Sequence, residues 1–366
     1  MARTGFVCEE KYFWHDNGAA VLDFPAGGLF QPGIHVESPE SKRRLRNLLE
    51  VSGLLSKLVR IPASMASEED ILRFHTSQYL ERLKAASARP GGAPFDDTCF
   101  VSRGSYEIAQ LSAGGVIAGV RSVLESQVRN AYCLTRPPGH HATSDQAMGF
   151  CLLGNIPIAL MHAQATLGLR RVAVFDWDVH HGNGTQAAFY DRSDVLTISI
   201  HQAEAYPLNS GLETDIGTGK GEGHNINIPL LPGSGIGAYE YALEGVVLPA
   251  LRRFRPELIV VASGFDASFF DPLGRQLLPS KTFGDMTKAI MGVADEVCGG
   301  KVVAVHEGGY SEAYVPFCGV AVVEALSGES SSVIDPYFES ITVNPGQVLQ
   351  SAQRDTIERV RALHRL

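Results

Sequence analysis

Short runs of apolar, mostly β-branched residues recur along the chain and alternate with longer segments of helical periodicity. Each run is apolar at consecutive positions rather than at every second position, a pattern typical of strands that helices cover on both faces. The runs predict strands at 131–135, 171–176, 195–200, 258–263 and 301–306. Because strands and helices alternate, we expect an α/β fold with a central, mostly parallel sheet flanked by helices on both faces.

The segments between the runs carry apolar residues at the three- and four-residue spacing of amphipathic helices. Capping signals mark two helix starts, because Ser38 precedes Pro39 and Ser67 lies three residues before Asp70. The predicted helices lie at 40–58, 71–85, 104–126, 155–167, 236–254, 281–297 and 311–326. The loop-like stretches between elements are too short for a convincing domain linker, so we expect one domain.

Polar side chains follow the predicted strands directly. The segments after the five strands are, in chain order, RPPGHHATSDQAMGF, DWDVHHGNG, HQ, GFD and EGGY. In an open parallel sheet, ligands bind at the carboxyl ends of the strands, so we expect these histidine, carboxylate and tyrosine side chains to surround one site. A dinucleotide-binding fold is poorly supported, because no GxGxxG motif follows the first strand.

Three of these residues have the pattern of metal ligands. Asp178 and His180 stand two residues apart, so in extended chain both side chains point to one face and can bind one ion. Asp266, after another strand, can supply a third ligand and leave a fourth position open for water, as catalytic zinc sites require. The set also suits iron(II), manganese or cobalt. The simpler alternative is that Asp178 and His180 only cap the helix that follows them.

Other polar residues at the strand ends suit acid–base chemistry. Adjacent histidines on one loop, His140 and His141, are candidates for proton transfer. Asp176 and Asn183 are natural partners for their second ring nitrogens. Tyr310, which follows two glycines, can donate a hydrogen bond to an oxyanion, although an ordinary turn tyrosine fits the pattern equally well.

Composition narrows the class of protein. The net charge of −9 argues against a general nucleic-acid binder and mildly favours cationic ligands. No apolar run is long enough for a membrane-spanning helix, and the first residues lack a secretory pattern, so we expect a cytoplasmic protein without a membrane partner. The six cysteines form no CxxC pair, which favours reduced, mostly buried thiols.

The motifs RPPGHH, GFCLLGN, DWDVHHGNGTQ, SGFDA and HEGGY resemble, in this order, those of the histone deacetylase family, which has the arginase–deacetylase fold. The resemblance covers about residues 5–330 and implies one deacetylase catalytic domain over 1–366, with a helical C-terminal tail at 331–366. Asn183 stands where class I members carry aspartate, and the segment HVESPESKRRL is similar to that of the bacterial, class II-like amidohydrolases.

The resemblance implies zinc-dependent hydrolysis of acyl-lysine-type amides. It assigns the ligands of one zinc ion to Asp178, His180 and Asp266. The acid–base pair is implied to be His140 and His141, and Tyr310 is implied to contact the substrate carbonyl. Gly149 and Phe150 are implied to form one wall of a substrate tunnel, and Tyr206 the opposite wall, where the family usually has phenylalanine. Leu273 is expected at the rim, and Asp97 is expected to anchor the substrate backbone.

The resemblance also implies bound cations and self-association. A structural potassium ion maps onto Asp176, Asp178, His180, Ser199 and Ile200. A weaker second cation site maps onto Phe189, Arg192, Val195 and Asn225. Since bacterial relatives often self-associate, a homodimer or homotetramer is plausible.

Three alternatives stay open. An acetylpolyamine amidohydrolase would catalyse the same amide hydrolysis on a different substrate. A ureohydrolase of the same fold would need two manganese ions and further bridging carboxylates. An acyl-binding protein without turnover would not need His140, His141 and Tyr310. Tyr310, where class IIa enzymes have histidine, favours a competent deacetylase. Because Asn183 is neutral, we expect His141 to be less basic than with an aspartate partner, and the histidine pair to titrate as one unit.

Overall fold

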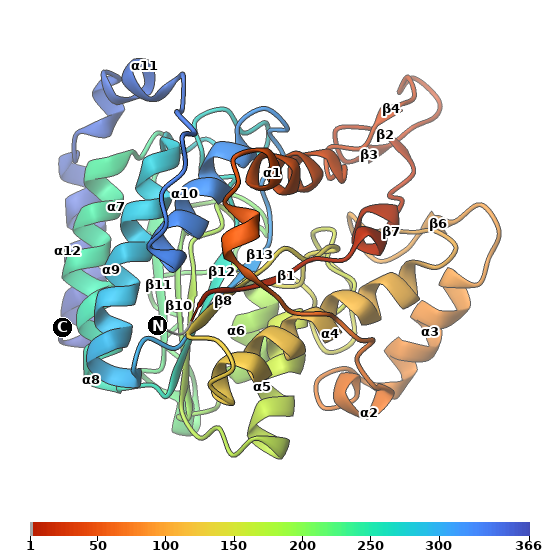
Figure 1. Ribbon diagram of the computed structural model, residues 1–366, viewed down its shortest axis with the longest axis horizontal. Coiled ribbons are helices and arrows are strands. Elements are labelled where there is room, and N and C mark those ends of the chain that lie inside the picture. The colour runs from red at the N-terminus through yellow and green to blue at the C-terminus, as the bar shows by residue number, and fades with distance from the viewer. Residues whose placement is uncertain (1–2) are drawn as a thin grey trace.

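Eight parallel strands form the central sheet of the computed structural model, which describes residues 3–366 (Figure 1). All neighbouring strands of this sheet pair in the same direction. From one edge to the other they are β11 (Asn225–Leu230), β10 (Val195–Gln202), β9 (Val172–Asp176), β12 (Leu258–Ser263), β13 (Val302–His306), β8 (Asn130–Cys133), β1 (Gly5–Val7) and β5 (Val59–Arg60). The predicted parallel sheet is confirmed.

All five predicted strands are present, with ends shifted by at most two residues. We did not predict β1, β5 or β11. The first two have only three and two residues, too few for a recognisable pattern. The edge strand β11 alternates apolar residues with Asn225 and Asn227, whose side-chain amides both donate to the Gln186 side chain at 2.8 Å.

Helices cover both faces of the sheet, and an apolar core lies under each layer (Figure 1). On one face lie α1 (Glu40–Val51), α7 (Ile236–Ala242), α8 (Leu248–Phe254), α9 (Ser280–Cys298), α10 (Val315–Ser327), α11 (Phe338–Thr342) and α12 (Ser351–His364). On the other lie α2 (Glu68–Ile71), α3 (Ser77–Ser87), α4 (Ser105–Leu124), α5 (Asn155–Thr166) and α6 (Asn183–Phe189). In β9, Ala173 and Phe175 enter the first core, and Val172 and Val174 the second, which explains the continuous apolar run.

Two predicted helices differ most from the structure. The helix predicted at 40–58 ends at Val51, because Gly53 takes the left-handed conformation, with φ of +76°, and only one 3₁₀ turn follows. The helix predicted at 71–85 is wrong. Ser67 caps α2 as expected, but the Thr76 side chain accepts a hydrogen bond from the Tyr79 amide and starts α3 as a separate helix.

The C-terminal segment packs on the central sheet. Its long helix, α12, lies beside the edge strand β11, and Ile357 and Val360 are fully buried in the same core as α9 and α10. In the segment 331–366, where we predicted a helical tail, α11 and α12 contribute side chains to the main core.

Two small antiparallel sheets lie on one side of the molecule (Figure 1). The first, here called the N-terminal sheet, contains β2 (Ala19–Val21), β3 (Phe24–Pro25) and β4 (Gly33–Ile34). The second contains β6 (Ala93–Pro94) and β7 (Phe100–Val101). The N-terminal sheet exposes large apolar side chains, which are Val21, Leu22, Phe24, Leu29, Phe30 and Ile34.

All six cysteines carry free thiols, and five of them are buried, in line with the expectation for reduced structural cysteines. Within residues 3–366, no helix combines the length and the apolar character that crossing a lipid bilayer requires.

Candidate functional site

The polar segments after four neighbouring strands meet at one edge of the sheet. The strands β9, β12, β13 and β8 lie side by side and run in the same direction, so their carboxyl ends adjoin. The loop after β8 carries His140 and His141, and the loop after β9 carries Asp178 and His180. Asp266 follows β12, and Tyr310 follows β13. The structure therefore brings together the side chains that the strand pattern predicts at one site.

Asp178, His180 and Asp266 form a buried group of potential metal ligands, with one ligand atom of each within 4.8 Å of the others. The Nδ1 atom of His180 lies 3.1 Å from Asp178 Oδ1 and 3.1 Å from Asp266 Oδ2. The chain bends at 178–180, beyond the end of β9, so Asp178 and His180 meet across a bend rather than along extended chain as we predicted. The Gly308 amide fixes Asp178 by donating to its Oδ2 atom at 2.8 Å.

Burial and mutual charge shift the pKa values within this group. Burial and the charge of Asp178 raise the pKa of Asp266 to about 7. Burial lowers the pKa of His180, but hydrogen bonds to Asp178 and Asp266 outweigh it and raise the pKa to about 10. Burial opposes ionisation of Asp178, yet the nearby His140 and His180 hold its pKa below the ordinary value. Two buried carboxylates and one imidazole are donor types that suit a divalent cation.

The adjacent histidines lie next to this group, with ring centroids 3.9 Å apart. The Nδ1 atom of His140 is 3.0 Å from Asp176 Oδ2, and the Nδ1 atom of His141 is 2.8 Å from Asn183 Oδ1. Burial lowers the pKa of His140, but Asp178 and Asp176 outweigh it and raise the pKa to about 10. Burial and the neighbouring positive charge of His140 lower the pKa of His141, and the weaker basicity expected from Asn183 in place of an aspartate stays a prediction.

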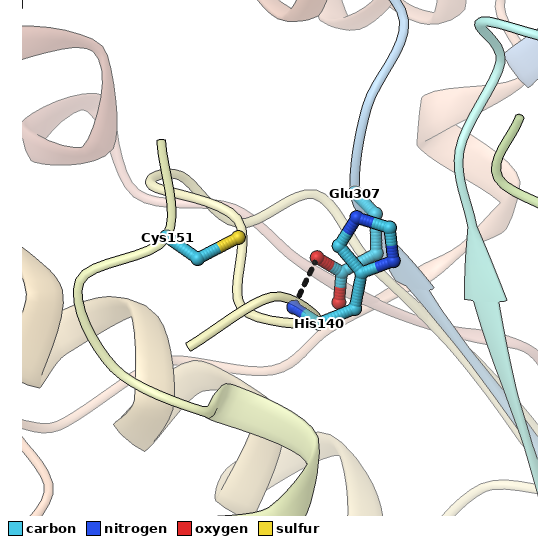
Figure 2. A group of neighbouring side chains, drawn as sticks. All are labelled: His140, Cys151 and Glu307. Carbon is cyan, nitrogen blue, oxygen red and sulfur yellow. Dashed lines mark hydrogen bonds between the residues drawn. The ribbon is translucent and has the colours of Figure 1, made fainter. Parts of the chain in front are cut away.

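Glu307 holds the main chain of the histidine pair, a role that we did not predict. Its Oε2 atom accepts hydrogen bonds from the amides of Gly139 at 2.7 Å and His140 at 3.1 Å. Figure 2 shows the carboxylate beside His140, with the hydrogen bond to the main-chain amide of His140 dashed and the Cys151 side chain nearby. The side chain is fully buried, its Oε1 atom has no hydrogen-bond partner among residues 3–366, and burial raises its pKa to about 7. The only signal in the sequence is one glutamate in the motif HEGGY.

Tyr310 closes one side of a cavity of about 330 Å³ that leads from the surface to His141 and His180. Its main-chain amide donates to Asp271 Oδ2 at 2.7 Å, which anchors the loop after β13. Phe150 packs edge-on against the Tyr310 ring, with centroids 5.7 Å apart. Gly149 takes a left-handed conformation, with φ of +50°, and an added Cβ there would clash with the His141 ring, so glycine is required.

The cavity also contains the residues predicted for the second tunnel wall and the rim. Tyr206 and Leu273 line it, and the hydroxyl of Tyr206 donates a hydrogen bond to the exposed Asp97. Burial and Asp97 raise the pKa of this hydroxyl, so it stays a donor. The cavity is also lined by residues that we did not predict, among them Asp23, Gln202 and Arg275.

Comparison with known proteins identifies this arrangement. The sequence model of the histone deacetylase domain matches residues 35–326. The chain belongs to the histone deacetylase family. It is 52% identical over 364 residues to a histone deacetylase-like amidohydrolase of Pseudomonas aeruginosa, covering 98% of this chain and 96% of that protein. It is 35% identical to a probable deacetylase of Archaeoglobus fulgidus, covering 90% and 88%. The crystal structure of the HDA15 HD domain superimposes with a TM-score of 0.87 at 29% identity, covering 99% and 94%.

As a member of the histone deacetylase family, the protein is a hydrolase of the deacetylase and amidohydrolase type that acts on acylated amines. Members of this family are generally zinc-dependent, and residues 3–366 provide a candidate metal-binding group at the expected edge of the sheet. The arginase–deacetylase fold predicted from the motifs agrees with the fold of the solved relative.

This deacetylase-family chain also buries a charged cluster behind Tyr310. The Arg136 guanidinium donates to both carboxylate oxygens of Glu37, at 2.9 and 3.1 Å, and Lys42 Nζ lies 3.1 Å from the same carboxylate. Lys42 Nζ is also 5.8 Å from the centre of the Tyr310 ring. Burial raises the pKa of Glu37, but Arg136 and Lys42 outweigh it and lower the pKa to about 2. We did not predict this cluster, because single charged residues in a motif do not show that they are buried together.

Three of the residues mapped to a potassium ion lie on the neighbouring strands β9 and β10, and Asp178 and His180 lie in the loop after β9. Asp176 pairs in register with Ser199 between β9 and β10, and Ile200 follows. The Ser199 hydroxyl lies 2.8 Å from the His201 Nδ1 atom. The second set, Phe189, Arg192, Val195 and Asn225, lies between the end of α6 and the starts of β10 and β11. Both cation sites stay predictions.

Proposed function

We propose that the protein removes acyl groups from acyl-lysine-type amides with one zinc ion per chain. The observation that carries the proposal is the buried Asp178–His180–Asp266 group beside His141 and Tyr310. Two carboxylates and one imidazole fit zinc and leave a position open. When bound there, zinc polarises the amide carbonyl and lowers the pKa of water toward about 7.

The histidine pair moves the protons in the proposed reaction. His141, which burial keeps neutral, accepts a proton as the oxygen of water bonds to the carbonyl carbon. A protonated histidine of the pair then delivers a proton to the amine nitrogen as the carbon–nitrogen bond breaks, so that a carboxylic acid and an amine leave. Asp176 and Asn183 hold the two rings in place through the Nδ1 atoms.

Tyr310 stabilises the charge that develops on the carbonyl oxygen. The pKa of its hydroxyl is raised by burial and by Asp266, so it remains a hydrogen-bond donor throughout. Phe150 and Tyr206 enclose the aliphatic part of the amine and exclude water from the reacting atoms.

Two of the alternatives are less consistent with the structure. Within residues 3–366, the other group of potential ligands is His140, Cys151 and Glu307, in which His140 already faces Asp176. This group offers no carboxylate that bridges to Asp178 or Asp266, so a site with one metal ion is favoured over the dinuclear ureohydrolase type. A binding protein without turnover would not require the oriented histidine pair or Tyr310.

An acetylpolyamine amidohydrolase is the second candidate. The carboxylates of Asp23 and Asp97 near the mouth of the cavity favour it, because they can bind a second, charged amine of the substrate. The net charge of −9 suits polyamines and basic peptides equally.

We also propose the finer features that the resemblance implies. These are class II-like character with Asn183 in place of an aspartate, a homodimer or homotetramer, and a structural potassium ion at Asp176, Asp178, His180, Ser199 and Ile200. We further infer a cytoplasmic protein of bacterial type without nucleic-acid or membrane partners.

The experiment that tests the proposal is hydrolysis by zinc-loaded protein of a panel of acetyl-lysine peptides, longer acyl-lysine and trifluoroacetyl-lysine peptides, acetylspermidine and acetylputrescine. We expect the acyl-lysine peptides to be hydrolysed with the highest kcat/KM. Dominant turnover of the acetylpolyamines would reject the peptide preference, and no turnover of any amide would reject the proposed function. The Tyr310→Phe variant is the control for contaminating hydrolases.

A further inference from the structure

A second cavity, here called the apolar groove, adjoins the mouth of the catalytic cavity. It has a volume of about 470 Å³ and lies between the N-terminal sheet and the segment 94–100. Asp23 and Thr98 line both cavities, so the groove adjoins the catalytic cavity at these two residues. The side chains that make the groove apolar are Ala20, Phe24, Pro25, Ala26, Pro94 and Phe100.

Tyr206 shows which end of the catalytic cavity meets the groove. Its ring is edge-on to His141, with centroids 5.0 Å apart, and its hydroxyl donates to Asp97, which lines the groove. The Tyr206 side chain therefore connects Asp97 in the groove to His141 of the proposed acid–base pair. Since the acyl carbonyl is placed at Tyr310, the groove adjoins the amine half of the substrate.

The two cavities also share a wall. The His35 side chain lines the groove and packs edge-on against Phe150 of the catalytic cavity, with ring centroids 5.1 Å apart. The His35–Phe150 pair therefore forms part of the wall between the two cavities.

The charge at the junction restricts the occupant. Asp23 is half-buried and Asp97 is exposed, and both carboxylates lie where the groove begins. Carboxylates repel an anionic ligand such as a fatty acid and accept hydrogen bonds from the N–H groups of a peptide backbone. Beyond them, Phe24 and Phe100 offer aromatic surface, against which another aromatic ring packs well.

We infer that the apolar groove is a subsite for an aromatic side chain directly next to the acylated lysine of a peptide substrate. This inference rests on the proposed hydrolysis of acyl-lysine amides and names the sequence context that the site selects. Phe24 is 60% exposed in the free protein, so covering it with a substrate side chain removes apolar surface from water.

Three capped peptides test the subsite: Ala-Lys(Ac)-Ala, Phe-Lys(Ac)-Ala and Ala-Lys(Ac)-Phe. With zinc-loaded protein, we expect one of the two phenylalanine peptides to exceed the alanine peptide in kcat/KM by roughly tenfold, mainly through KM. In Phe24→Ala, which removes one wall, and in Ala26→Trp, which fills the groove, the ratio should fall toward one. Ile34→Ala is the matched control, because Ile34 is 82% exposed on the same sheet and does not line the groove.

The possible failures are distinguishable. If none of the three peptides is hydrolysed, the proposed function fails and the subsite fails with it. If all three are hydrolysed with equal kcat/KM, the function stands and the subsite is rejected. A preference that survives in both groove variants also rejects it. If Phe24→Ala changes the molar mass by light scattering but leaves the preference intact, the groove is covered by a second copy of the chain instead.

Discussion

At the scale of single residues, the proposed catalytic side chains are positioned by hydrogen bonds and ion pairs from neighbouring residues. Sequence motifs predicted the residues with chemically distinctive groups, because two adjacent histidines or a tyrosine after two glycines are unusual patterns. They did not predict Glu307, Asp271 or Glu37, each of which is one acidic residue whose role follows from what it contacts. Burial and hydrogen-bond partners depend on the three-dimensional fold, so no local sequence pattern predicts them.

Tyr310→Phe removes the proposed donor to the carbonyl oxygen. We expect kcat to fall by about 10²- to 10³-fold, the usual cost of losing one oxyanion donor, while zinc content stays at one per chain. Steady-state kinetics and metal analysis of the same preparation check this. Wild-type kcat in this variant would contradict the role of Tyr310.

Glu307→Ala removes the acceptor of the Gly139 and His140 amides. Misplacement of His140 is expected to lower kcat by about 10- to 100-fold with little change in KM. Glu307→Gln is the matched control, because its amide oxygen can accept the same two hydrogen bonds and should retain most of the activity. Equal losses in both variants, or none in Glu307→Ala, would show that Glu307 does not position the histidine.

Glu37→Gln tests the buried charged cluster. The folded pKa of about 2 lies below the ordinary value of 4.5, so ionised Glu37 adds about 3 kcal/mol of stability above pH 4.5, which is lost as the pH falls from 4.5 to 2. At pH 7 the variant leaves Arg136 and Lys42 without a carboxylate partner, and we expect a loss of about 3–5 kcal/mol in the free energy of unfolding.

Urea unfolding of wild type and Glu37→Gln across this pH range measures the effect. The difference between the two proteins should be largest near neutral pH and shrink below pH 4.5, because protonated glutamate and glutamine are both neutral. A difference that stays constant down to pH 2 would contradict the low pKa of Glu37.

At the scale of elements, the loops after β12 and β13 approach the proposed metal ligands closely. An added Cβ at Gly308 would lie 2.6 Å from Asp178 Oδ2 and would also clash with Asp266, and one at Gly264 would clash with Asp178. The long buried strands were predictable, since a run of apolar residues suffices to define them. The short strands β1 and β5 and the break before α3 were not, because the sheet and the Thr76 cap define them rather than periodicity.

Gly308→Ala displaces both carboxylates from their positions. We expect zinc affinity to fall by about 10- to 100-fold, the usual cost of disturbing the groups that orient metal ligands. Competition with a chromophoric chelator measures the affinity. Gly292→Ala in the middle of α9 is the control, because an added Cβ there meets no described atom within 4 Å. Equal zinc affinity in the two variants would contradict the assignment of Asp178 and Asp266.

At the scale of the whole molecule, one parallel sheet gathers the proposed metal ligands, the histidine pair and Tyr310. Segments as distant as 140–141 and 310 meet because β8 and β13 are neighbours in the sheet. The strand order could not be predicted from the sequence, since apolar runs of similar composition can pair in many orders. The convergence itself was predictable, because all parallel strands end at the same edge.

The central claim is that one divalent cation, held by Asp178, His180 and Asp266, is required for hydrolysis of an acylated lysine. Titration of zinc into metal-free protein, with acetyl-lysine peptide hydrolysis as the readout, tests it most directly. The account predicts no activity without metal, a linear rise and a plateau at one equivalent of zinc. Full activity without metal, a plateau at two equivalents, or no hydrolysis at any zinc concentration would contradict it.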